Sequence, residues 1–129
     1  MEKVNVELDG KLYSCRGCGT HLALADDLIS KDYYCPNGKA FLFRNVILFI
    51  NVRSNVSFGV PEERMLITGI YIIVGIFCCS CGQNLGWKYE SARDKTQKFK
   101  EGKFILDRGM IDDGANSQHN IDTAGPVDS

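Results

Sequence analysis

The sequence has no excess of either charge. Its 15 lysine and arginine residues are balanced by 16 aspartate and glutamate residues, which gives a formal net charge of −1. Domains that hold nucleic acid by neutralising its phosphates are usually clearly basic, so this balance argues against nucleic acid as a partner.

A long apolar run is also missing. The most apolar window covers residues 65–79 and is shorter than the about 20 residues that a transmembrane helix requires. The first ten residues alternate polar with apolar side chains, whereas a secretory signal needs an uninterrupted apolar stretch. We therefore expect an intracellular protein without a membrane partner, in a compartment that keeps its six cysteines reduced. Reduced cysteines in this number indicate a metal site rather than disulfides.

No segment has the sustained apolar repeat of an amphipathic helix, so the sequence predicts a mainly β fold in one domain. Apolar runs and alternation predict strands at residues 4–8, 11–14, 40–52 and 103–108, and a strand or strand pair at residues 64–77. Turns are expected at residues 9–10, 26–30 and 36–38, and a loop at residues 54–63. The polar segment 94–102 is expected to form a single turn or a loop, anchored by Phe99.

The end of the sequence is polar, contains glycine and proline, and has no periodicity. Such a composition cannot bury a core, so residues 111–129 are expected to be a disordered tail. The folded domain is accordingly assigned to residues 1–110.

Two short stretches repeat one pattern. Residues 15–23 (CRGCGTHLA) and 78–86 (CCSCGQNLG) both have the form C-x-x-C-G-x-x-L followed by a small residue. In this register Cys15 and Cys18 correspond to Cys78 and Cys81, and Cys79 falls between two ligands.

The repeated pattern suits a metal ion. Two thiolates at this spacing can point at one ion when the chain between them turns tightly, and the glycine that follows permits a positive φ. Four thiolates match the tetrahedral preference of Zn²⁺ and leave no open coordination position, so the sequence predicts one structural zinc ion. Buried free cysteines are the alternative, which the matched glycines and leucines disfavour. Cys35, or Cys79 in place of Cys78, is an alternative ligand.

Longer segments resemble the Yippee-like proteins: YSCRGCGTHLALADDLISKDYYC, GKAFLFRNV, EERMLITG and IFCCSCGQNLGWKYESARDKTQKFKEGKFIL. The resemblance runs from about residue 4 to residue 106. It implies the beta-tent fold, in which two antiparallel sheets are pinned together by a four-cysteine zinc site, here Cys15, Cys18, Cys78 and Cys81. The same fold is found in the thalidomide-binding domain of cereblon, the Mis18 kinetochore proteins and the methionine sulfoxide reductase B group.

The resemblance also implies a function. It identifies the chain as a non-enzymatic structural-zinc protein that acts as a protein-interaction module in the nucleus and cytoplasm. One alternative is a nucleic-acid-binding domain like a zinc ribbon, which would use the basic strip of Lys95, Lys98, Lys100 and Lys103. A second is a sulfoxide-reductase-like enzyme, but no cysteine follows Gly86, and the arginine-cysteine-asparagine block of those enzymes is absent.

The sequence departs from the family pattern in two places. The spacer between the cysteine pairs, residues 19–77, has 59 residues and exceeds the family's usual length. We place the surplus at residues 47–53, where it either lengthens a hairpin or is retained intron sequence. Tyr71 stands where relatives often carry a histidine.

Trp87 in the LGWKY block is the one tryptophan of the chain. Core packing beside the second cysteine pair is its simplest interpretation. By resemblance to cereblon, where the corresponding tryptophan forms one wall of an aromatic cage for a cyclic imide, Trp87 is also a candidate pocket or interaction residue. The other two cage tryptophans have no counterpart in residues 70–77, so imide binding is not expected.

Overall fold

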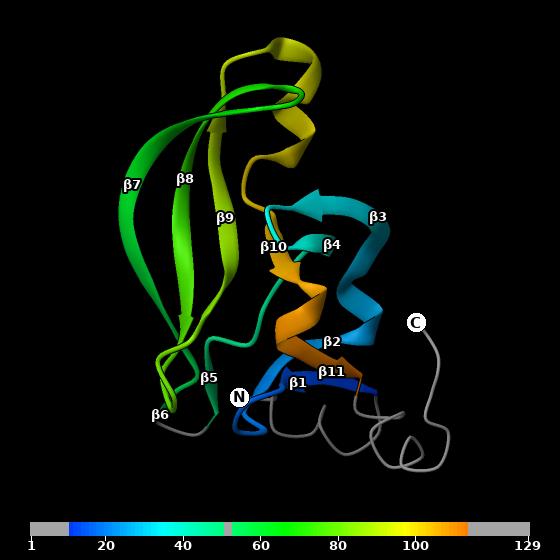
Figure 1. The fold of residues 1–129 in the computed structure, drawn as a ribbon, viewed down its shortest axis with the longest axis vertical. Coiled ribbons are helices and arrows are strands. Elements are labelled where there is room, and N and C mark those ends of the chain that lie inside the picture. Colours follow the sequence, from blue (N-terminus) through cyan, green and yellow to red (C-terminus); the bar gives the residue numbers. More distant parts are fainter. Residues whose placement is uncertain (1–10, 51–52, 114–129) are drawn as a thin grey trace.

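A computed structural model describes residues 11–50 and 53–113, and nearly all of its regular structure is antiparallel sheet (Figure 1). The smaller sheet has the order β11-β1-β2 and consists of β1 (Leu12–Cys15), β2 (His21–Leu24) and β11 (Ile111–Asp113). The larger has the order β3-β4-β10-β9-β8-β7, with β3 (Leu28–Cys35), β4 (Gly38–Phe43), β7 (Val56–Leu66), β8 (Gly69–Cys78), β9 (Asn84–Ala92) and β10 (Phe104–Asp107). The mainly β fold with two antiparallel sheets is thus confirmed.

Short elements complete the described chain. Three 3-10 helices are present: η1 (Ala25–Asp27), η2 (Lys95–Lys100) and η3 (Arg108–Met110). A separate two-stranded ladder joins β5 (Phe49–Ile50) to β6 (Arg53–Ser54), so the described residues of the surplus placed at residues 47–53 include a short antiparallel pair. None of the described helices has the length and apolarity needed to cross a membrane.

The larger sheet is covered on both faces, because apolar residues alternate along its central strands. In β4, Phe41 and Phe43 pack in the core between the two sheets, whereas Ala40 and Leu42 point to the opposite face. The side chains of strand β10 alternate in the same way, and Ile105 packs with Ala40 and Leu42 on the opposite face. A strand with apolar residues on both sides belongs inside a sheet with two cores. The metal-binding end and the pocket described below lie against these two different cores.

Strand β7 corrects the loop expected over residues 54–63. The sequence there contains Gly59 and Pro61, which normally interrupt a strand. Here β7 is at the edge of its sheet, and its pairing with β8 shifts register between Phe58 and Pro61. An edge strand with a bulge tolerates a residue without an N–H donor. Of the strand or strand pair expected over residues 64–77, the structure has the pair, because β7 and β8 form a hairpin that turns at Ile67-Thr68.

The strand expected over residues 40–52 is also wrong in length, because β4 ends at Phe43. Arg44 leaves the sheet and donates its backbone N–H to Asp27 O at 2.7 Å, while its guanidinium lies 3.6 Å from the Asp27 carboxylate. Asn45 also bonds to that carboxylate. The polar Arg44-Asn45 pair thus ends the apolar pattern of the strand.

The segment around η2 differs from the expectation in which of its residues is buried. Asp94 caps η2 by accepting the Thr96 N–H at 2.9 Å, as a polar start predicts. Phe99, however, is 56% exposed, and Lys100 is the buried residue of this helix. The prediction that Phe99 anchors this turn is therefore wrong.

The boundary at the end of the domain lies further along than expected. β11 pairs with β1, so that Ile111 is opposite Cys15 and Asp113 opposite Tyr13. Arg16 strengthens this pairing through an ion pair with Asp112 at 3.0 Å. Residues 111–113 thus belong to the folded domain. The rest of the expected tail, and the strand and turn expected within residues 4–10, lie outside the described residues.

Candidate metal centre and pocket

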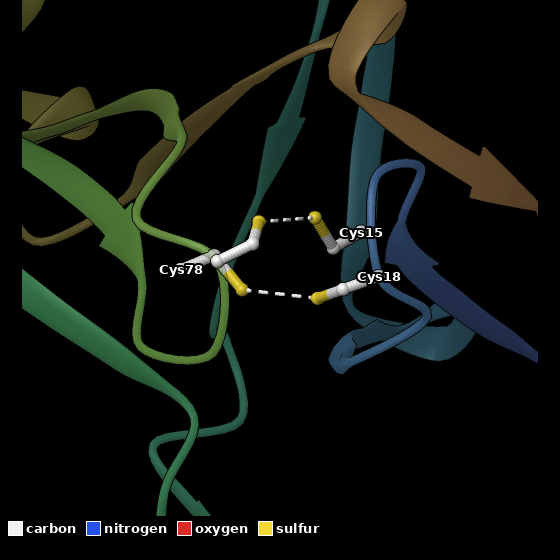
Figure 2. A group of neighbouring side chains, drawn as sticks. Cys15, Cys18 and Cys78 are labelled. Carbon is white, nitrogen blue, oxygen red and sulfur yellow. Dashed lines mark hydrogen bonds between the residues drawn. The ribbon is translucent and has the colours of Figure 1, made fainter.

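Four cysteines meet where the two sheets come together. Cys15 ends β1 and Cys18 follows in the turn, whereas Cys78 ends β8 and Cys81 follows in its turn. Figure 2 shows Cys15 and Cys18 on one loop facing Cys78 across the gap between the sheets. The structure therefore brings together the four cysteines that the internal repeat puts in register.

The two loops are built by the same hydrogen bonds. In the first, the Cys15 N–H donates to Thr20 O and the Gly19 N–H donates to Cys15 O. In the second, the Cys78 N–H donates to Gln83 O and the Gly82 N–H donates to Cys78 O. Gly19 and Gly82 have φ of 83° and 79°, the left-handed conformation that glycine adopts without strain. The sequence repeat is thus a structural repeat.

The spacing of the sulfur atoms fits a zinc ion. All four Sγ atoms lie within 4.8 Å of one another. The Cys15–Cys81 and Cys18–Cys78 sulfur pairs are 3.6 and 3.5 Å apart. A tetrahedron with Zn–S bonds of about 2.3 Å has sulfur atoms about 3.8 Å apart. Cys15, Cys18, Cys78 and Cys81 would hold the ion, which would join the smaller sheet to the larger one.

The thiols differ in how readily they ionise. The Cys18 Sγ lies 3.1 Å from Thr20 Oγ1, and the Thr20 hydroxyl and N–H lower the pKa of Cys18 to about 6. Burial raises the pKa of Cys15 to about 12. A metal ion could therefore bind the Cys18 thiolate directly, whereas the buried Cys15 thiol would have to lose its proton when the ion binds.

The remaining two cysteines lie outside this cluster. Cys35 ends β3 and lies at the wall of the pocket, with its thiol 4.0 Å from Lys39 O. The exposed Cys79 donates its N–H to Asn55 O at 2.9 Å. In the described structure, the alternatives in which either residue replaces a ligand therefore have no geometric support.

A pocket of about 770 Å³ opens near the other end of β8. Trp87 of β9 is one of its walls, as the candidate role for this residue requires. Its ring meets that of Tyr89 edge to face, with centroids 6.1 Å apart. The other lining residues come from β3 and the following turn, from the β7–β8 hairpin, from β9 and from η2: Ser30, Asp32, Tyr33, Tyr34, Cys35, Pro36, Met65, Leu66, Ile67, Thr68, Tyr89, Gln97, Phe99 and Lys100.

Lys100 is a pocket residue that sequence reasoning placed in a surface strip. Its Nζ donates to Tyr71 Oη at 3.0 Å and to Thr68 Oγ1 at 3.2 Å. Tyr71 is itself buried and donates to Gln97 Oε1 at 3.3 Å. The tyrosine that replaces the family's frequent histidine therefore still supplies a polar group at this position. A signal for this contact is absent from the local sequence, because the partners of Lys100 come from strands far away along the chain.

Comparisons with known proteins agree with this geometry. The family model described as "Yippee zinc-binding/DNA-binding /Mis18, centromere assembly" matches residues 11–124. A yippee-like protein of Arabidopsis thaliana is 51% identical over 122 residues, which cover 93% of this chain and 89% of that protein. Protein yippee-like 4 of Rattus norvegicus is 45% identical over 97 residues, or 75% of this chain and 71% of that protein. The crystal structure of the Mis18 "Yippee-like" domain matches the fold with a TM-score of 0.63 at 12% identity, over 81% of this chain and 95% of that one.

Two antiparallel sheets that meet at a four-cysteine cluster define a beta-tent protein with a zinc-binding site. Within this class the sequence comparisons are specific. The chain belongs to the Yippee-Mis18 family, and its curated relatives are yippee-like proteins.

Proposed function

We propose that this protein is a non-enzymatic protein-interaction module, built around one structural zinc ion and working in the nucleus and cytoplasm. The observation that carries the proposal is the closed set of four thiols at the junction of the two sheets. A zinc ion held by four thiolates keeps no coordination position for a substrate, so its role is to hold the sheets together.

The β7–β8 hairpin supplies a surface for a protein partner. Val60 is 71% exposed and Ile67 is 99% exposed. β7 is also the edge of the larger sheet, so one side of its backbone has no neighbouring strand in the described part of the chain. Exposed apolar side chains beside a sheet edge are typical of surfaces that bind another protein.

The cysteines outside the cluster do not support an enzyme of the sulfoxide-reductase type. A reactive cysteine is usually activated by a lowered thiol pKa. Burial instead raises the pKa of the Cys35 thiol. Cys79 follows a metal-site cysteine on an exposed turn, away from the pocket walls.

Three of the four lysines expected to form a basic strip are engaged in the structure, and Lys95 is exposed. Lys98 lies 3.1 Å from the Glu101 carboxylate, Lys103 donates to Phe99 O, and Lys100 is buried. A strip that neutralises phosphates needs such charges free at the surface. This arrangement favours protein over nucleic acid as the partner.

Proximity labelling in cells tests the proposal, with the wild type compared with a Val60→Ser/Ile67→Ser double variant. Both side chains are exposed, so the variant should keep its fold, and native mass spectrometry should find one zinc per chain in both proteins. We expect the variant to lose a defined set of labelled proteins in the nucleus and cytoplasm.

Phe49→Ser is the matched control, because Phe49 is 55% exposed but lies on β5, which pairs with β6 and not with the β7–β8 hairpin. Identical labelling by all three proteins would contradict the interaction surface. Absence of zinc from the wild type would contradict the structural role of the metal.

A further inference from the structure

A lysine ammonium is buried at the pocket. Lys100 is 5% exposed, yet its side chain belongs to the pocket lining. Its bonds to Tyr71 Oη and Thr68 Oγ1 use two of the three donors of an ammonium group, so one donor remains.

Aromatic rings surround this ammonium. The Nζ atom lies 5.3, 5.3 and 5.6 Å from the ring centroids of Tyr33, Tyr71 and Tyr89. Burial raises the pKa of Tyr33 and of Tyr89, so both phenols stay neutral at physiological pH. Of the ion pairs found among the described residues, none includes Lys100. A buried cation without an anion is unfavourable, and an incoming anion would relieve this cost.

A second donor belongs to another residue of the pocket lining. The Trp87 Nε1 atom is buried and has no acceptor of good hydrogen-bond geometry in the described structure. Its closeness to the Tyr89 hydroxyl lowers the pKa of that phenol, against the larger rise caused by burial. Buried donors are normally satisfied, so an unsatisfied one at a pocket wall indicates an acceptor from outside.

The walls of the pocket determine the size and the apolar character of the rest of the ligand. Leu66, Pro36 and Phe99 give the pocket apolar sides, and its volume of about 770 Å³ is within the range of small-molecule sites. We propose that this pocket binds a small aromatic carboxylate, whose carboxylate meets Lys100 and Trp87 Nε1 and whose ring lies between the apolar walls. This inference goes beyond the proposed function and needs no protein partner.

Two kinds of ligand could present an aromatic ring beside a carboxylate. A free aromatic acid has a carboxylate beside its ring, and so does a peptide chain that ends in phenylalanine. The first is represented by 3-phenylpropionate and the second by N-acetylphenylalanine, and each has a neutral amide of nearly the same shape. Preference for one acid over the other identifies the source.

Trp87 provides the measurement, because it is the only tryptophan in the sequence. We expect at least one of the acids to change its fluorescence saturably, and to bind about tenfold or more tightly than the matching amide, since a charge-assisted hydrogen bond is lost with the amide. Equal affinities for acid and amide, or no saturation with either acid at millimolar concentration, would overturn the proposal.

A lysine variant tests the assigned contact. Lys100→Met replaces the ammonium with an apolar chain of similar length and should abolish the preference for the acid. Lys95→Met is the matched control, because Lys95 is exposed on the same helix and is not a lining residue. Lys100→Met that keeps its zinc and also keeps the acid preference would show that the assigned contact is wrong.

Asp32→Asn is a second test of the proposal, which can be used even if Lys100→Met fails to fold. Asp32 is an exposed carboxylate in the pocket lining and repels an anion there. Its neutralisation should improve binding of the acid about twofold to fivefold at low salt and leave the amide unchanged. An unchanged ratio of acid to amide affinity in this variant would count against the proposal.

Discussion

The two ends of strand β8 use polar groups in opposite ways. At Cys78 the strand enters a loop that is closed by two backbone hydrogen bonds and contributes two thiols to a closed set of four. At Gly69 it leaves a hairpin beside a pocket in which Lys100 keeps a free donor and Trp87 Nε1 has no acceptor of good geometry among the described residues. The first end is a closed set of ligands for one metal ion, whereas the second has donors that an outside ligand could use, as proposed above.

The two ends are also well separated. β8 has 10 residues, so at about 3.3 Å per residue its ends are about 30 Å apart. They pack against different cores, because Cys78 lies in the core between the sheets and Tyr71 in the core of the opposite face. Changes at the metal end should therefore affect folding, and changes at the pocket end should mainly affect binding.

Cys81→Ser should have the largest effect, because it removes one of four zinc ligands. Metal binding to a small domain supplies folding free energy, about 10–16 kcal/mol in zinc-finger peptides, which equals or exceeds the stability of most domains. We expect loss of zinc by native mass spectrometry and loss of the β-sheet signal by circular dichroism.

Cys79→Ser is the matched control for this change. Cys79 is exposed, and its backbone N–H makes the contact with Asn55 O, which serine retains. The variant should bind one zinc ion and unfold at the wild-type temperature. Zinc loss comparable to that of Cys81→Ser would mean that Cys79 is a ligand.

Gly86→Ala should have the next largest effect, because the backbone of Ile105 leaves no room for a side chain. Gly86 has φ of 150°, and a Cβ atom there would lie 1.9 Å from Ile105 O. Backbone strain and overpacking together should cost about 3 kcal/mol or more, measured by urea unfolding.

Gly17→Ala supplies the comparison for Gly86→Ala. A Cβ at Gly17 would meet the Gln83 Nε2 atom at 2.6 Å, which is the end of a flexible side chain that can move away. Its cost should be clearly smaller, although it lies in the metal-binding loop. Equal costs for the two variants would show that the approach of β10 to Gly86 is not the cause.

The metal end could be predicted from the sequence because its signal is local. Each loop carries its two cysteines and its glycine within five residues, and the match between Cys15-Cys18 and Cys78-Cys81 gives the register. The structure adds the second half of the pattern, the repeated hydrogen bonds at Gly19 and Gly82, which no residue type alone determines.

The pocket end could not be predicted in the same way, because its contacts join distant segments. Lys100 looks like a surface residue beside the apolar Phe99. Its buried ammonium instead donates to Tyr71 and Thr68 and lies near the rings of Tyr33, Tyr71, Tyr89 and Phe99. A lysine stem is apolar enough to enter a core when its ammonium finds such partners. Strand β7 was missed for a related reason, since an edge position that permits Pro61 depends on the whole sheet.

Tyr71→Phe should have the smallest effect on stability of the three changes and should act at the pocket end. It removes the hydroxyl that accepts from Lys100 and donates to Gln97, inside a buried network. Leaving a buried ammonium with one fewer acceptor should cost about 1–3 kcal/mol in urea unfolding, with one zinc ion still bound.

Tyr34→Phe is the control, because Tyr34 is 64% exposed and its hydroxyl can bond to water both before and after folding. It should be neutral within about 0.5 kcal/mol. Because Thr68 Oγ1 still accepts from Lys100 in Tyr71→Phe, the ammonium should then have a second donor free, and affinity for the acid probe should rise relative to its amide. A Tyr71→Phe protein that loses zinc would show that the two ends of β8 are coupled, against the separation inferred from their different cores.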